Sequence, residues 1–147
     1  MEAVSFDLAK KLKEKGFIIP TKDIIGMYNE LGVFHTLTTS ADYEKCADGT
    51  KYRCYYDYED FDEYDYIAPT ISQVLKWLRE EKNIHINIDF YSDKISDNEY
   101  TYWSYRIIDM NNGKIIYKFD NKQCMLEFES YEEVAITGVE YVLNNLI

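Results

Sequence analysis

The chain has 147 residues, and its 27 acidic and 16 basic residues give a formal net charge of −11. A hydrophobic content of 46% excludes global disorder, and one domain is usual at this length, so we expect residues 1–147 to form a single domain. The acidic balance argues against direct nucleic-acid binding, because such binding depends on Lys and Arg side chains that neutralise phosphates.

The sequence predicts a cytoplasmic protein with reduced thiols and no membrane contact. Its first residues include acids, Glu2 and Asp7, where a signal peptide needs basic and then apolar residues. No segment approaches the roughly 18 consecutive apolar residues of a membrane-spanning helix. The cysteines, Cys46, Cys54 and Cys124, are odd in number and form no C-x-x-C pair, which is not typical of a disulfide framework.

The first expected element is a helix that Ser5 caps and that runs to about Lys15, with Gly16 ending it. The apolar segments 17–20 and 24–34 predict one or two strands. A turn signal at Asp48-Gly49 predicts a short hairpin, whose strands would be residues 43–46 and 52–56.

A second helix is expected to begin at Thr70, which forms a capping-box pattern with Gln73, and to end near residues 82–83. Strict alternation of apolar and polar residues then predicts a strand at 84–91. Three further elements follow along the chain: strands at 100–109 and 114–120 joined by a type I′ turn at Asn112-Gly113, a short fourth strand at 124–128, and a capped helix at 130–145. The predicted fold is α+β, with an antiparallel meander sheet of three to five strands packed by two or three helices on one face.

Alternation also assigns side chains to the two faces of this sheet. We expect the helices to cover the apolar face, which comprises Ile84, Ile86, Ile88, Phe90, Trp103, Tyr105 and Ile107. The other face is rich in residue types that are enriched at protein interfaces, and its candidate partner-binding residues are His85, Tyr91, Tyr100, Tyr102 and Arg106. Three interpretations stay open: a surface for a partner, an isologous homodimer, or a face covered by residues 17–66.

The segment YYDYEDFDEYDY at residues 55–66 is the most acidic part of the chain. Its acids are Asp57, Glu59, Asp60, Asp62, Glu63 and Asp65. A solvated edge strand or loop explains such a segment most simply. A recognition strip for a basic protein partner, a mimic of the nucleic-acid backbone, and a hard-cation site are the functional alternatives, although no glycine provides the turn of an EF-hand loop.

The residues that could support chemistry form no recognisable motif. The three cysteines and the two histidines, His35 and His85, lack the spacing of a zinc site, and no glycine-rich phosphate loop is present. We therefore expect no metal and no cofactor. A Cys–His pair assembled from Cys54 or Cys124 with either histidine is the basis of the alternative that the protein is a small enzyme.

Four stretches carry a family resemblance: SFDLAKKLKEKGF at 5–17, APTISQVLKWLREEKNIHI at 68–86, YWSY at 102–105 and SYEEVAITGVEYVLNNLI at 130–147. They resemble a family of small uncharacterised proteins of phages, prophages and mobile elements of gut bacteria. This resemblance implies a phage-related origin and no catalytic residues. The leading prediction is an acidic protein–protein interaction protein; the alternatives are a small Cys/His-dependent enzyme and a nucleic-acid-mimicking inhibitor of a basic host protein.

Overall fold

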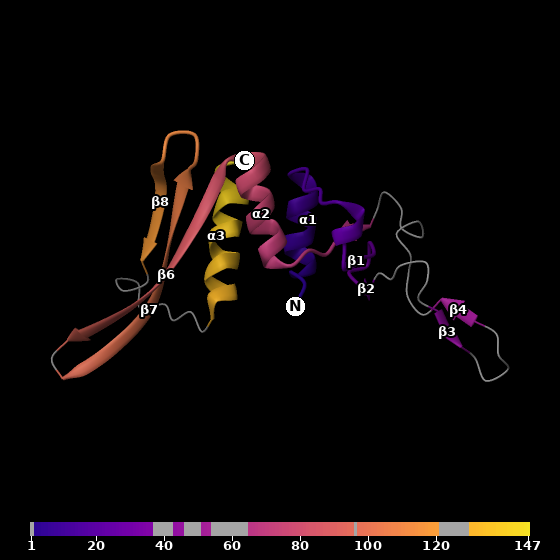
Figure 1. Cartoon of the computed structure of the whole chain (residues 1–147), viewed down its shortest axis with the longest axis horizontal. Helices are drawn as coiled ribbons and strands as arrows, with labels where there is room; N and C mark the ends of the chain where they lie inside the picture. The colour runs from indigo at the N-terminus through magenta and orange to yellow at the C-terminus, as the bar shows by residue number, and fades with distance from the viewer. Residues whose placement is uncertain (1, 37–42, 46–50, 54–64, 96, 121–129) are drawn as a thin grey trace. The chain divides into compact units, whose positions relative to one another are not determined.

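In the computed structural model the chain forms two compact units, Met1–Thr70 and Ile71–Ile147. Figure 1 draws their helices and strands. It describes residues 2–36, 43–45, 51–53, 65–95, 97–120 and 130–147. Helices and antiparallel strands are both present, so the fold is of the α+β class, as the sequence predicts. The single domain stays a prediction.

The first unit combines one α-helix with short antiparallel strands. Its elements are α1 (Phe6–Glu14), the 3₁₀ helix η1 (Thr21–Asp23), β1 (Gly26–Tyr28), β2 (Phe34–Thr36), β3 (Tyr43–Lys45), β4 (Lys51–Arg53) and β5 (Tyr66–Ile67). One sheet has the order β2-β1-β5, and β3 pairs with β4 in a separate hairpin. The predicted hairpin is thus confirmed, whereas its turn at Asp48-Gly49 lies outside the described residues.

Helix α1 begins and ends where the sequence indicates. The Ser5 hydroxyl oxygen accepts a hydrogen bond from the backbone N–H of Leu8 at 3.3 Å, which satisfies one free donor of the first turn. Gly16 follows the helix with a φ of +79°, a conformation that costs glycine little. The strands predicted after this helix lie at Gly26–Tyr28 and Phe34–Thr36; residues 17–20 form no strand and lead through Pro20 into η1.

The second unit is a meander with two helices. Its elements are α2 (Ile71–Lys82), β6 (Ile84–Ile95), β7 (Asn98–Asp109), β8 (Lys114–Asp120) and α3 (Tyr131–Asn145). The strands form an antiparallel sheet in the order β6-β7-β8, which confirms the predicted meander. The expected fourth strand at 124–128 lies outside the described residues.

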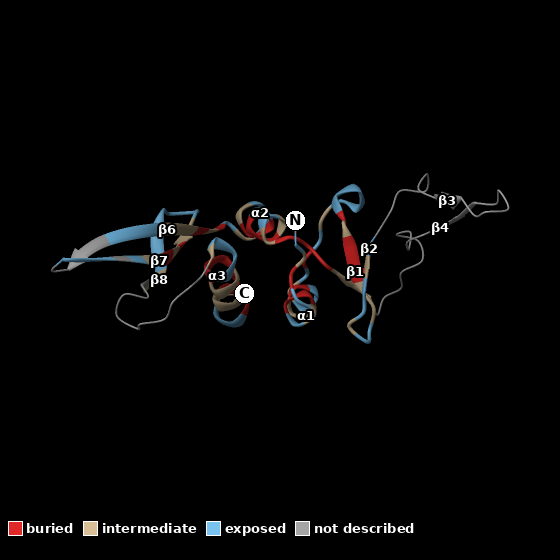
Figure 2. Ribbon diagram, turned by 90° about the horizontal axis from the view of Figure 1, so that it is seen from below, coloured by how far each residue is buried: buried red, intermediate tan, exposed pale blue. Residues whose placement is uncertain are grey.

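The register of β6 and β7 agrees with the predicted apolar face. Ile86 lies opposite Ile107, and Ile88 lies opposite Tyr105. Helix α3 packs on this face. It approaches so closely at Gly138 that a Cβ added there would lie 3.0 Å from Ile86 and 3.5 Å from Tyr105. Helix α2 contacts β6 and α3. The buried residues of this unit lie along α2, α3 and the strands beside them, whereas Phe90–Ser92 of β6 and Asn98–Glu99 of β7 are exposed (Figure 2). Phe90 is therefore 55% exposed although it belongs to the apolar face.

The turn between β7 and β8 differs from the predicted type I′ geometry. Type I′ needs a positive φ at both central residues, whereas here Gly113 has a φ of +71° and Asn112 has no positive φ. Asp109 pairs with Lys114 across a four-residue loop, and the Gly113 N–H donates to the Asp109 carbonyl at 2.8 Å. The Asp109 side chain accepts a hydrogen bond from the Asn111 N–H at 2.9 Å, and the Asn112 side chain accepts one from the Lys114 N–H at 2.8 Å, so the loop is stabilised without a second left-handed residue.

Candidate functional site

Strands β6 and β7 bring several of the predicted partner-binding residues together on the face opposite α3. In this register His85 lies opposite Ile108, Asn87 opposite Arg106, and Tyr91 opposite Tyr102. Because residues two apart along a strand share a face, the same face carries Asp89 and Ser104. We call this face of the sheet, which carries His85, Asn87, Asp89, Tyr91, Tyr102, Ser104 and Arg106, the polar face. Ser104 itself is buried, and the other six residues are half-buried or exposed.

Tyr91 and Tyr102 form a stacked aromatic pair on the polar face. Their ring centroids lie 5.3 Å apart, and the ring planes are inclined by 24°. Tyr91 is 42% exposed, and Tyr102 is half-buried. The pair therefore presents rigid aromatic surface to the outside, while each ring limits the conformations of the other.

Near Tyr91 lies an ion pair whose carboxylate also accepts a hydrogen bond from an asparagine. Arg106 Nη2 lies 3.4 Å from Asp89 Oδ2, and the Asn87 side-chain amide donates to the same oxygen at 3.1 Å. The side chains of Arg106 and Asp89 are 35% and 30% exposed, so both groups are only partly withdrawn from water. Among the described residues, Arg106 Nε is shielded from solvent and has no hydrogen-bond partner.

His85 lies at the end of the polar face where β6 begins, and it is half-buried. Burial lowers the pKa of its imidazole below the ordinary value, and the positive charge of Arg79 lowers this pKa further. Within the described part of the chain, His85 Nδ1 is also shielded and has no hydrogen-bond partner. The environment thus favours the neutral ring.

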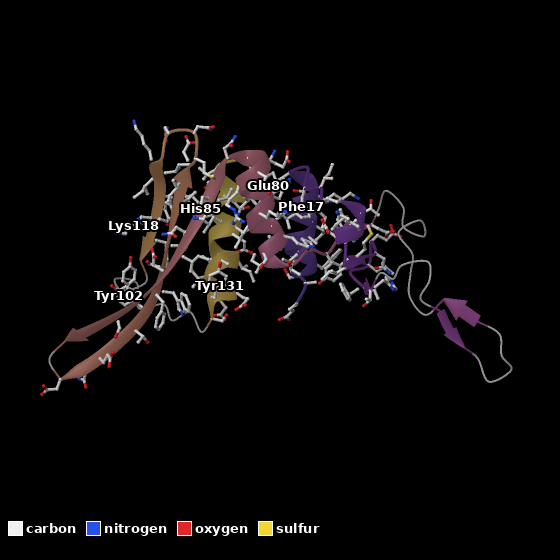
Figure 3. All side chains as sticks on the ribbon, in the orientation of Figure 1. Phe17, Glu80, His85, Tyr102, Lys118 and Tyr131 are labelled. Carbon is white, nitrogen blue, oxygen red and sulfur yellow. The ribbon has the colours of Figure 1, made fainter. Side chains whose placement is uncertain are left out.

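The third strand adds a cation that the sequence analysis did not select. Lys118 of β8 lies directly opposite Arg106, and Figure 3 shows it with His85 and Tyr102 on the three strands of the sheet. A register shift between Ile107 and Ile108 produces this pairing, since Ile107 lies opposite Tyr117 but Ile108 lies opposite Ile115. The extra residue, Ile116, has no signal in the sequence that would reveal the bulge.

The remaining predicted site residues are not part of this geometry. Tyr100 lies in β7 opposite Asp93, but its side chain lies outside the described part of the structure. Asp57, Glu59, Asp60, Asp62 and Glu63 all lie outside the described residues. Asp65 belongs to the first unit, where its backbone carbonyl accepts a hydrogen bond from Lys13 Nζ at 2.8 Å.

The described residues contain no group of three or more His, Cys, Asp and Glu side chains that could hold a metal ion. Cys46, Cys54 and Cys124 lie outside the described residues, so the Cys–His enzyme hypothesis stays untested. His35 belongs to the first unit, and its Nε2 lies 3.5 Å from the Asn29 side-chain nitrogen. No helix in the described part of the chain has both the length and the apolar character needed to cross a membrane.

No protein-family model matches the chain, and comparisons with curated proteins and with solved structures gave no match. The polar face must therefore be interpreted from its own geometry.

Proposed function

We propose that this protein is a non-catalytic interaction protein and that the polar face of β6 and β7 binds a protein partner. The observation that carries the proposal is the stacked Tyr91–Tyr102 pair beside the Asp89–Arg106 ion pair, on the face opposite α3. Tyrosine and arginine are among the residues enriched at protein interfaces and at their energetic hot spots.

The aromatic pair suits binding because little ordering is needed when a partner arrives. Each tyrosine has two side-chain torsions, and the stacking contact already restricts them. A partner that covers the pair gains apolar contact with the rings and hydrogen bonds to their hydroxyl groups. The neighbouring ion pair supplies fixed donors and acceptors, which select among partners more than they add affinity.

The proposal includes an origin and a location for the protein. The resemblance of residues 5–17, 68–86, 102–105 and 130–147 to small phage and mobile-element proteins supports a phage-related origin. The odd number of cysteines supports action in the cytoplasm, where thiols are kept reduced. The acidic segment at 55–66 would steer a basic region of the same partner.

Affinity capture from lysate of the source cells tests this proposal. The test variant is Tyr91→Ser with Tyr102→Ser, and Tyr131→Ser is the matched control, because Tyr131 has the same 42% exposure as Tyr91 but belongs to α3. We expect a protein captured by the wild type and by the control to be lost with the double variant, provided that circular dichroism shows both variants folded.

A further variant separates the polar face from the acidic segment. It carries Asp57→Asn, Glu59→Gln, Asp60→Asn, Asp62→Asn, Glu63→Gln and Asp65→Asn. We expect slower association and weaker salt dependence from this variant, with the same partner still captured. If the variant without both tyrosines captured the same proteins as the wild type, a role for the polar face would be contradicted.

A further inference from the structure

Two cations lie directly opposite each other on the polar face. Arg106 of β7 pairs with Lys118 of β8, and the pairing lies in the regular part of the ladder beyond the bulge. Residues in this relation have Cβ atoms about 4.5–5.5 Å apart, and like charges placed so are destabilising. The chain carries 27 acidic residues against 16 basic ones, so a pair of opposed cations runs against its overall composition.

The described residues do not provide partners for all the hydrogen-bond donors of either cation. Lys118 is exposed and makes no ion pair with a described carboxylate. Arg106 has one carboxylate contact, at 3.4 Å, which is longer than the roughly 2.7–2.9 Å of a strong charge-assisted hydrogen bond. A guanidinium has five N–H donors, and Arg106 Nε has no partner among the described residues.

The carboxylate of Asp89 does not depend on Arg106 alone. The Asn87 amide donates to the same Asp89 oxygen at 3.1 Å, so this carboxylate keeps a hydrogen bond if the guanidinium turns toward another anion. The arginine can therefore share its donors with a ligand without leaving Asp89 unpaired.

We propose that Arg106 and Lys118 form a carboxylate-binding subsite, and that the partner presents an acidic peptide segment to the polar face. The inference rests on the proposed interaction function and names the chemistry of the partner. A carboxylate between the two side chains would accept from the guanidinium and from the ammonium group, which would relieve their mutual repulsion.

The neighbouring residues define the rest of the segment. Tyr102 is on the same strand and face as Arg106 but four residues away, roughly 13 Å along the strand, so the stacked tyrosines provide a surface for an aromatic side chain of the same peptide segment at that distance from the acid. The net charge of −11 does not forbid an acidic ligand, because charges farther away than about 8 Å are largely screened at physiological ionic strength.

The test uses synthetic peptides and the full chain. The probe is a peptide of alternating glutamate and tyrosine, followed by amide NMR of β6–β8, and its comparison peptides replace glutamate with glutamine or with lysine. The test variant is Arg106→Gln with Lys118→Gln. The matched control is Lys76→Gln with Lys114→Gln, which also removes two positive charges but from α2 and from the residue opposite Asp109.

We expect the glutamate peptide to bind the wild type and the control alike, and to bind the test variant about tenfold more weakly, the effect of losing roughly 1.4 kcal/mol of binding free energy. We expect no binding of the glutamine peptide. The urea midpoint of the test variant should change little, since its substitutions remove the repulsion between the two cations together with the partly exposed Asp89–Arg106 ion pair, and each effect is small. The subsite would be overturned if the glutamate peptide bound the test and control variants with equal affinity, or if the lysine peptide bound the wild type more tightly than the glutamate peptide. It would also be overturned if inorganic phosphate bound these cations more tightly than the glutamate peptide.

Failure of the subsite and failure of the proposed function give different results. If only the subsite is wrong, a partner from lysate still requires Tyr91 and Tyr102 but is captured equally by the Arg106→Gln, Lys118→Gln variant. If the proposed function is wrong, the double tyrosine variant captures the same proteins as the wild type.

Discussion

Gly138 of α3 lies directly over Ile86 of β6, so closely that a Cβ on the glycine would come within 3.0 Å of Ile86 Cγ2. Ile86 is buried, with 6% of its surface exposed, and so is the glycine. A residue that weakens an isolated helix is thus placed where the helix meets the sheet, because a side chain there would compete with the isoleucine for space.

A larger residue at position 138 should therefore destabilise the second unit. We expect Gly138→Val to lower the free energy of unfolding by about 2 kcal/mol, since overpacking of a filled core costs about 1–3 kcal/mol. Gly138→Ala should change stability by about 1 kcal/mol or less, because gained helix propensity offsets the close contact. Urea unfolding monitored by circular dichroism measures both values. The cost of Gly138→Val should shrink in an Ile86→Ala background, and additive costs would contradict direct contact.

The burial of Ile86 predicts a strong effect of charge at that position. Ile86→Asp should lower the free energy of unfolding by about 4 kcal/mol, which combines lost apolar burial with a carboxylate that has no buried partner. The same substitution at Ile115, which is 53% exposed on β8, should cost about 1 kcal/mol or less. Urea denaturation compares the two variants, and similar costs would mean that the register of β6 is shifted by one residue.

The stacked tyrosines should couple energetically in the free protein. We expect the double-mutant cycle of Tyr91→Ala and Tyr102→Ala to give a coupling free energy of about 1 kcal/mol, typical of an aromatic pair. Thermal or urea unfolding of the four proteins provides the measurement. A coupling near zero would show that the rings do not support each other before a partner binds.

The lowered pKa of His85 makes the second unit less stable in acid. The unfolded imidazole titrates near 6.5, whereas burial and Arg79 hold the folded pKa lower, so the unfolded chain takes up the proton first. Stability linked to this group is therefore complete above the unfolded pKa and is lost as the pH falls from there through the folded pKa. We expect the free energy of unfolding to fall less steeply between about pH 7.5 and 5.5 in His85→Gln than in the wild type. These limits lie about one unit above and below the pKa of the unfolded imidazole.

Arg79 provides the matching control for this prediction. Arg79→Gln should raise the pKa of His85 toward its ordinary value, because it removes the second cause of the shift. Arg79→Lys keeps the positive charge and should leave the pKa lowered. NMR titration of the His85 ring protons measures the pKa directly, and a wild-type pKa above the ordinary value would refute this account.

Alternation along strands and capping residues at helix ends were sufficient to predict much of the second unit. The alternation from Ile84 to Tyr91 has a period of two, and a slip of one residue would move its isoleucines to the other face, so the face that Ile86 shares with Ile107 was predictable, whereas their direct pairing was not. Helix starts were predictable for a similarly local reason. Ser130 accepts a hydrogen bond from the Glu133 N–H at 3.2 Å, and that contact needs only residues three apart in sequence.

Only the tertiary structure decided what lies beside Arg106. A two-residue turn at Asn112-Gly113 without a bulge would place Lys118 opposite Ile107, on the apolar face. The four-residue loop and the extra residue Ile116 instead place Lys118 opposite Arg106. The same shift turns Tyr117 toward α3, where its ring stacks on Tyr141 with centroids 3.8 Å apart. The sequence by itself therefore determined which residues alternate along each strand. Packing of aromatic rings against a helix distant in the sequence determined how the third strand aligns, because the register across a bulge depends on contacts that no local pattern encodes.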